Sequence, residues 1–235
     1  AVLEVADLAA LGTAQVAALT TLSVLALNSS QLQALTSVQV GALTTRQVGA
    51  LTSVQLSALE TTDVQALKSV QTGVLTSVQV AGLTTDQVPV LGTAQVAALS
   101  VTALQALGTD QVGALTTGQV SGLTTGQVSG LTTGQVASLS TAQVGALTSV
   151  QVGALTTKQV AALETGDVAV LTTRQVGVLS SSQVGALTTA QVVALTSVQA
   201  GVLSEAQAAA LTSAQVAVLE VADLAALGTA QVAAL

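Results

Sequence analysis

Four regularly built acidic pairs are the residues of this 235-residue chain best suited to chemistry. In each pair a glutamate precedes an aspartate by three residues, and the pairs are Glu4/Asp7, Glu60/Asp63, Glu164/Asp167 and Glu220/Asp223. Two carboxylates on one turn offer hard oxygen ligands to Ca²⁺. They suit the positive N-terminus of a helix equally well, and no Asp/Gly-rich calcium loop is present. The eight residues are therefore candidate calcium ligands, with a structural role as the simpler interpretation.

The rest of the composition excludes most catalytic chemistry. The chain contains no His, Cys, Met, Phe, Trp or Tyr, so it offers no imidazole base, thiol nucleophile or nitrogen and sulfur metal ligand from these side chains. No nucleophile and base can be paired, and a sugar would find no aromatic platform. We expect no enzymatic activity, no catalytic residue and no cofactor.

The charge of the chain also narrows its partners. The net charge is −7, and the only basic residues are Arg46, Lys68, Lys158 and Arg174. Four scattered cations make no electrostatic surface for nucleic acid. Mean hydropathy is +0.76, yet Thr, Ser and Gln interrupt the apolar residues throughout, whereas a membrane span needs roughly 18 consecutive apolar residues. We expect neither a nucleic-acid partner nor insertion into a membrane.

One eight-residue unit fills the chain, and it must position every residue named above. Leucine occurs at every eighth position from Leu3 to Leu235 without exception. Numbered from this leucine, the octad reads Leu–Thr–Thr/Ser–x–Gln–Val–small–small, as in residues 115–122. Position four varies and tolerates charge, so we expect it to face solvent. The small residues at positions seven and eight predict a close approach of backbones there.

Each octad contains the signals that start a helix. With Thr116 as N-cap, Gln119 falls at the third helical position, which gives the Thr-x-x-Gln capping box. Leu115 before the cap and Val120 at the fourth helical position form the pair of a hydrophobic staple. The next cap follows after about one and a half turns of helix. The pattern predicts one very short capped helix per octad, in which the Gln side chain forms a hydrogen bond back to the N-cap residue.

Helices this short cannot stand alone, because isolated helices below roughly 12 residues are marginal in water. They must bury Leu and Val against neighbouring octads, which predicts an all-α solenoid with a Leu/Val interior. Pro89, at position seven, disfavours a regular helix interior and indicates a loose or 3₁₀-like last turn. A β-solenoid remains the alternative, since eight is a multiple of the strand period and Thr and Val favour strands.

A longer repeat lies over the octads. Residues 1–19 are identical to residues 217–235, an offset of 216 residues or 27 octads. We expect residues 1–235 to form a single octapeptide-repeat solenoid, and we expect this solenoid to be a segment of a longer chain with a super-repeat of about 216 residues.

The octad Leu-Thr-Thr-x-Gln-Val-x-Ala resembles the octapeptide tracts of very large bacterial surface and adhesin-like proteins, over residues 3–235. The resemblance implies an exported stalk, adhesin or matrix fibre, located outside the cell or on its surface. We expect a non-catalytic structural protein that self-associates into a filament, stalk or fibre, since it has few charges and many small apolar residues. The alternative is an adhesin-type module that binds a glycan or ice surface through rows of Thr and Ser hydroxyls.

Overall fold

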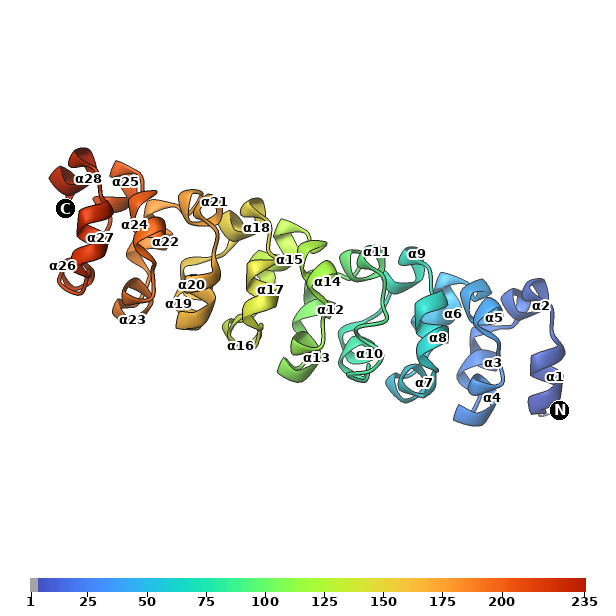
Figure 1. Cartoon of the computed structure of the whole chain (residues 1–235). Coiled ribbons are helices and arrows are strands. Elements are labelled where there is room, and N and C mark those ends of the chain that lie inside the picture. Colours follow the sequence, from blue (N-terminus) through green and yellow to red (C-terminus); the bar gives the residue numbers. More distant parts are fainter. Residues whose placement is uncertain (1–3) are drawn as a thin grey trace. The chain divides into compact units, whose positions relative to one another are not determined.

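The computed structural model describes residues 4–235, and all regular structure in that range is helical. The helices are four to six residues long and follow one another at the spacing of the octad. No strand occurs among residues 4–235, so the β-solenoid alternative is wrong. The chain divides into two compact units, Ala1–Leu123 and Thr124–Leu235. Figure 1 shows short helices side by side in successive turns within each unit, as in an all-α repeat solenoid.

Unit 1 contains fourteen helices in its described part. They are α1 (Val5–Ala10), α2 (Thr13–Ala18), α3 (Thr21–Leu25), α4 (Ser29–Gln33), α5 (Ser37–Ala42), α6 (Thr45–Ala50), α7 (Ser53–Ala58), α8 (Thr61–Ala66), α9 (Ser69–Thr72), α10 (Ser77–Ala81), α11 (Thr93–Ala97), α12 (Val101–Gln105), α13 (Thr109–Gly113) and α14 (Thr117–Ser121).

Unit 2 contains fourteen more helices. They are α15 (Thr125–Gly130), α16 (Thr133–Ala137), α17 (Thr141–Gly145), α18 (Ser149–Ala154), α19 (Thr157–Ala162), α20 (Thr165–Val170), α21 (Thr173–Gly177), α22 (Ser181–Gly185), α23 (Thr189–Val193), α24 (Ser197–Gly201), α25 (Glu205–Ala208), α26 (Ser213–Val216), α27 (Val221–Ala226) and α28 (Thr229–Ala234).

The capping box builds the helices as the sequence predicts. At α14, the Thr116 hydroxyl accepts a hydrogen bond from the Gln119 N–H at 3.1 Å, and the Thr116 N–H donates to Gln119 Oε1 at 2.6 Å. The N-cap has extended backbone, with φ −72° and ψ 157°. The staple residues Leu115 and Val120 are both buried. The prediction of one short capped helix per octad is confirmed in the described octads apart from residues 83–90, which form turns.

Helices from neighbouring turns of the solenoid pack on one another. Each helix generally contacts the helix three places along the chain, so that α5 contacts α2 and α8, and α24 contacts α27. Position one and position six fill the interior, where Leu, and Val or its replacements, are almost fully buried away from the chain ends. Since side chains of isolated short helices gain little burial, this packing between turns stabilises the fold.

The last turn of most helices is tight. The N–H of the next leucine donates to the carbonyl three residues back, as from Leu115 to Val112 at 3.1 Å, which is the 3₁₀ pattern. Around Pro89 this tightening goes further, because residues 85–90 form turns without an α-helix. The capping pair of that octad persists, with Thr84 N–H donating to Gln87 Oε1 at 2.9 Å. The predicted loose or 3₁₀-like end of the octad is confirmed.

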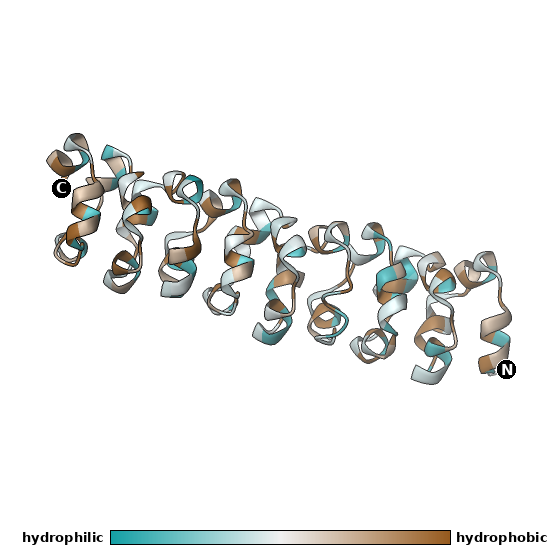
Figure 2. Cartoon of the chain, viewed as in Figure 1, coloured by the Kyte–Doolittle hydropathy of each residue, from teal (hydrophilic) through white to brown (hydrophobic). Residues whose placement is uncertain are grey.

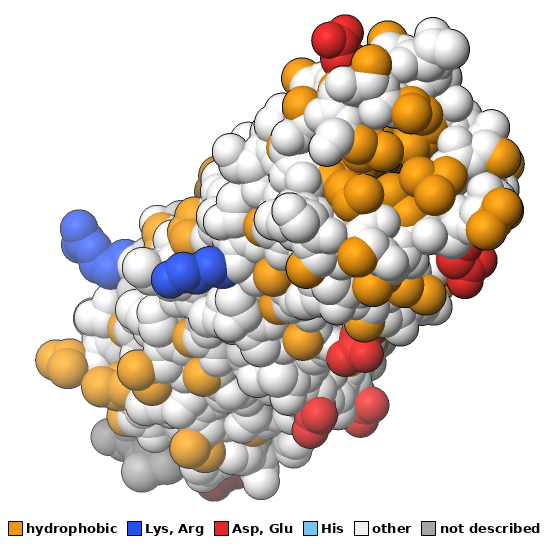
Figure 3. All heavy atoms as spheres, turned by 90° about the vertical axis from the view of Figure 1, so that its left-hand side faces the viewer, with side chains coloured by type: hydrophobic (Ala, Val, Ile, Leu, Met, Phe, Trp, Pro, Cys, Tyr) orange, Lys and Arg blue, Asp and Glu red, His pale blue; other side chains and the backbone are white. Residues whose placement is uncertain are grey.

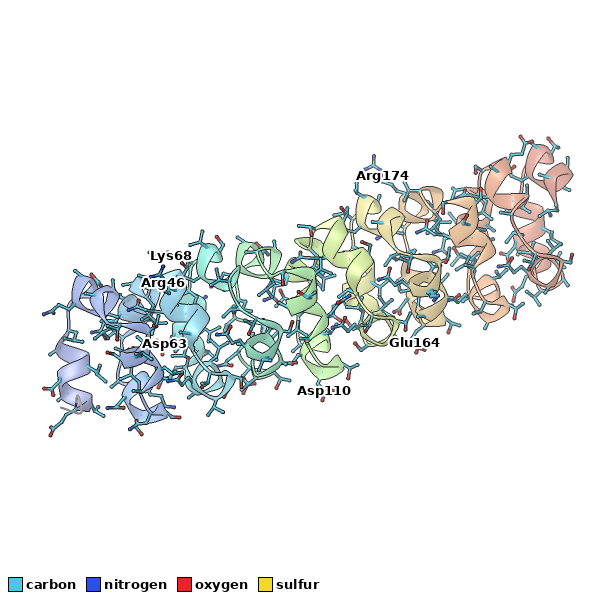
Figure 4. The ribbon with its side chains drawn as sticks, turned by 180° about the vertical axis from the view of Figure 1, so that it is seen from behind. Arg46, Asp63, Lys68, Asp110, Glu164 and Arg174 are labelled. Atoms are coloured by element: carbon cyan, nitrogen blue, oxygen red, sulfur yellow. The ribbon has the colours of Figure 1, made fainter. Side chains whose placement is uncertain are left out.

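The surface positions also follow the octad. Position four faces solvent, with Val78 70% and Val150 71% exposed, and Figure 4 shows Arg174 projecting outward from the same position. Among residues 4–235, no helix is long and apolar enough to cross a membrane. The helices are only four to six residues long, and Figure 2 shows hydrophilic and hydrophobic residues mixed along them.

Candidate functional site

The glutamine at position five is the polar residue on which the interior depends. Gln159 accepts a hydrogen bond from the Thr156 N–H through Oε1 at 2.7 Å, which completes the cap of its own helix. Its amide nitrogen Nε2 then donates to the carbonyls of Val128 at 2.8 Å and Leu131 at 2.7 Å. These carbonyls lie 31 and 28 residues earlier, in the preceding turn of the solenoid. One side chain therefore caps the start of one helix and the end of another.

The same bridge recurs along the chain. Gln39 donates to the carbonyls of Leu8 at 3.0 Å and Leu11 at 2.6 Å, again 31 and 28 residues back. A solenoid turn therefore takes between three and four octads. The carbonyls at a helix end lack partners within the helix and must be satisfied elsewhere. In residues 4–235, no buried side-chain nitrogen or oxygen lacks a hydrogen-bond partner.

The octad pattern predicted only the cap half of this role. The sequence does contain a signal for the contacts with the preceding turn, which is the strong preference for an amide at position five. Gln fills this position in 23 of 29 octads, and Glu never does. Negative charge suits the first turn of a helix, so a purely local cap would also accept Glu. A carboxylate cannot donate a hydrogen bond when ionised. The preference for Gln therefore reports the second set of contacts.

The predicted acidic pairs occupy this same polar position. In all four pairs the aspartate at position five accepts a hydrogen bond from the N–H of its glutamate, at 3.1 to 3.4 Å. The glutamate side chain is exposed in every pair. Asp63, Asp167 and Asp223 are buried, whereas Asp7 is exposed. The aspartates thus replace the cap half of glutamine, but an ionised carboxylate has no hydrogen to donate to the preceding turn.

Burial raises the pKa of two of these aspartates. Desolvation raises the pKa of Asp63 above its ordinary value, opposed by the hydrogen bond from the Glu60 backbone and reinforced by the negative charge of Glu60. The pKa of Asp167 is raised in the same way, with Glu164 in the place of Glu60. Removing a carboxylate from water disfavours its charged form. Asp63 and Asp167 are therefore polar residues of the interior whose desolvation is only partly offset by a hydrogen bond.

The structure does not gather the pairs into one centre. Each pair lies on its own helix, α1, α8, α20 and α27, and residues 4–235 contain no group of three or more His, Cys, Asp or Glu side chains placed to hold a metal ion. Calcium binding by Glu4, Asp7, Glu60, Asp63, Glu164, Asp167, Glu220 or Asp223 stays a prediction.

Comparison with known families identifies the family of this repeat. The profile of the ALTTAQ repeat family matches the chain six times, over residues 1–37, 24–53, 56–93, 88–125, 123–157 and 160–197. The chain belongs to the ALTTAQ repeat family. The predicted octapeptide-repeat tract is confirmed by this match. No curated protein matches the chain.

The hydroxyls of the ALTTAQ repeats divide between two tasks. The residue at position two caps the helix, so its hydroxyl oxygen already accepts a hydrogen bond. The Thr44 hydroxyl, for example, accepts from the Gln47 N–H at 3.2 Å. Position three lies beside it, and its Thr is exposed in octads such as those of Thr45 and Thr117. In unit 1, Thr20, Thr21, Thr44, Thr45 and Arg46 line a shallow groove. Only the position-three hydroxyls are available to a ligand there.

Proposed function

We propose that this chain is a non-catalytic structural repeat protein that self-associates into a filament, stalk or matrix fibre outside the cell or on its surface. The observation that carries the proposal is the uniform turn-to-turn interface, in which each octad offers its neighbour the same apolar surface and the same amide bridge. An interface that repeats along a chain can also repeat between chains. We propose further that residues 1–235 form one solenoid within a longer protein.

A further feature supports assembly. Position four carries bare valines, including Val38, Val54, Val150 and Val198, which are 66% to 71% exposed. Exposed apolar side chains in number favour association between molecules. The extracellular location rests on the resemblance of the octads to tracts of bacterial surface proteins.

Concentration dependence tests the proposal. Sedimentation velocity of the purified chain across a wide concentration range is expected to show growing assemblies, and electron microscopy of the same samples is expected to show fibres. A single monomer boundary at all concentrations would contradict self-association of this chain. Protease treatment of intact source cells tests the location, since a surface protein is degraded and an internal one is protected.

The groove at Thr21, Thr45 and Arg46 favours a second candidate, an adhesin-type module that binds a glycan or ice. Thr45 and Arg46 are exposed and Thr21 is partly so, and hydroxyl and guanidinium groups donate to sugar oxygens. A glycan array and an ice-recrystallisation assay of the monomer test it. Binding lost in Thr45→Val but kept in Thr117→Val would support this groove, and no binding to either surface would reject it.

A further inference from the structure

The chain contains a single asparagine, and this residue begins an acceptor motif for N-linked sugars. The motif is Asn28-Ser29-Ser30, which has the form Asn-x-Ser/Thr with a residue other than proline in the middle. Asn28 is also the N-cap of α4. Capping alone does not require asparagine, because Thr and Ser cap most of the other helices, as at α5, α14 and α22.

The fold places the two ends of the Asn28 amide in different surroundings. Its oxygen Oδ1 accepts a hydrogen bond from the Gln31 N–H at 2.9 Å, so this end of the amide faces the helix that it caps. The nitrogen Nδ2 lies on the other side of the same planar group. Within residues 4–235, no acceptor forms a hydrogen bond with Nδ2. The atom that carries the sugar in N-linked glycosylation is therefore free.

The rest of the motif is open to solvent as well. Asn28, Ser29 and Ser30 are all exposed, and Ser30 occupies the solvent-facing position four. Its hydroxyl, which completes the motif, has no hydrogen-bond partner among the described residues. Positions two and four are also exposed in the middle of the chain, as at Thr116 and Gly118. The exposure of the motif therefore follows from the octad and not from the ends of the chain.

We propose that Asn28 is the acceptor for an N-linked sugar. In this modification, Nδ2 forms a bond to the anomeric carbon of a sugar carried on the diphosphate of a nucleotide or a lipid. The bond from that carbon to the phosphate oxygen breaks, the diphosphate leaves with the bonding electrons, and Nδ2 gives up one of its two protons. Oδ1 remains an acceptor in the product, so the cap of α4 is kept.

A sugar at this position also suits the surface of the chain. Only 6% of the residues are charged, and on the face in view Figure 3 shows isolated charged side chains among hydrophobic and neutral ones. N-linked sugars are bulky and solubilising, so a sugar hydrates a surface on which charge is sparse. The inference rests on the proposed location outside the cell, since this motif is used in secreted proteins.

Mass spectrometry of the chain purified from its source cells tests the inference. The tryptic peptide that ends at Arg46 contains the only asparagine. We expect the mass of this peptide to be raised by a sugar, which fragmentation places on Asn28. A single sugar is expected from a nucleotide-linked donor, and an oligosaccharide from a lipid-linked one. An unmodified peptide would overturn the inference.

Two variants produced in the same cells separate the motif from the cap. Ser30→Ala keeps Asn28 and its cap but removes the hydroxyl of the motif. Asn28→Ser keeps a capping residue and gives the octad the same first five residues as residues 179–183, Leu-Ser-Ser-Ser-Gln. We expect both variants to keep their helical circular dichroism and to lose the sugar completely. A sugar that persists in Asn28→Ser would lie on a hydroxyl, and the inference would be wrong.

The octad of residues 179–186 supplies the matched control. Ser180 caps α22 by accepting a hydrogen bond from the Gln183 N–H at 3.2 Å, and it is exposed like Asn28. Adding Ser180→Asn to Asn28→Ser moves the complete motif to this octad. We expect the sugar to move with the motif, to the tryptic peptide that begins at Gln175.

The location and the modification can fail separately. Protease treatment of intact cells reports the location, and the mass of the peptide reports the sugar. If the chain is degraded from outside and Asn28 carries no sugar, the location stands and the inference is wrong. If the chain is protected and Asn28 is unmodified, both fail. A sugar on Asn28 of a protected chain would support the inference and reject the location.

Discussion

At the scale of the residue, position five decides how turns are joined. Glutamine has both an acceptor and two donors, so it can serve the cap N–H and the carbonyls of the preceding turn at once. Aspartate keeps the acceptor and loses the donors. Buried polar groups contribute little net stability when paired but cost more when a partner is missing. Variation at position five should therefore change stability far more than variation at solvent-facing position four.

Replacing one interior amide by a carboxylate tests this role. Gln159→Glu keeps the acceptor but faces the Val128 and Leu131 carbonyls with negative charge, so we expect a loss of about 1–3 kcal/mol in the free energy of unfolding. Gln15→Glu is the matched control, since Gln15 is exposed and its hydrogen bond is to the Gly12 N–H. Urea unfolding of both variants measures the difference. Equal effects would contradict the bridge.

The buried aspartates Asp63 and Asp167 predict that the free energy of unfolding depends on pH. The raised pKa values of Asp63 and Asp167 mean that the folded state holds these protons more tightly than the unfolded state. Their contribution is fully present below the unfolded pKa of about 3.9 and is lost as pH rises through the raised folded pKa. The double variant Asp63→Gln/Asp167→Gln, which restores the amide, should therefore be more stable than the unmodified chain at pH 7.

This gain in the double variant should shrink as the pH falls toward 4, because the native aspartates then become neutral. Urea titrations at several pH values between about 4 and 7 measure it. A difference in stability that stays constant with pH would show that the two aspartates do not titrate in this range.

Much of the residue-scale picture was readable from the sequence. The spacing of Thr116 and Gln119 alone predicted their mutual hydrogen bonds, because a capping box depends only on residues of one helix start. The bond from Gln159 to Val128 was not predictable, since it depends on which octads meet across a turn. The spacing of the acidic pairs was visible in the sequence and suited a helix N-terminus, but the sequence could not reveal that Asp63 is buried and Asp7 exposed.

At the scale of the element, glycine marks where helices of adjacent turns touch. A Cβ on Gly41 would lie 2.8 Å from the Ala66 carbonyl oxygen, and one on Gly201 would lie 3.0 Å from the Ala226 carbonyl oxygen. Each partner stands 25 residues later, in a helix that packs against that of the glycine. The predicted close approach at position seven is confirmed at these residues. Gly177 differs, because a Cβ there would meet nothing within 4 Å.

Alanine at two glycines should therefore have opposite effects. Gly177→Ala fills open space in a helix, and we expect it to stabilise the chain by about 0.5–1 kcal/mol through a narrower unfolded ensemble and better helix propensity. Gly41→Ala meets backbone that cannot move aside easily, and we expect a destabilisation of about 1–2 kcal/mol. Thermal unfolding of both variants checks the sign. Stabilisation by Gly41→Ala would show that α5 and α8 can separate without cost.

At the scale of the whole molecule, the period of the sequence predicted the fold class, because thirty leucines at one spacing allow few architectures. The number of octads per turn was not predictable. It depends on the angle at each Leu–Thr junction, where both residues have extended backbone, as at Leu131 with ψ 144° and Thr132 with ψ 157°. A few degrees at each junction change which octads meet, and no residue type encodes them.

Assembly of the whole chain should respond to charge in a defined direction. Each copy carries a net charge of −7, so copies repel one another at neutral pH, while the exposed valines at position four that favour association are uncharged. Added salt screens the repulsion and does not weaken apolar contacts. We therefore expect the critical concentration to fall as NaCl rises at pH 7, and to fall further as the pH approaches the isoelectric point near 4.1. Light scattering across a salt series measures it. If salt instead dissolved the assemblies, ion pairs would be holding the copies together, and the association would have to run through the few basic residues rather than through the exposed valines at position four.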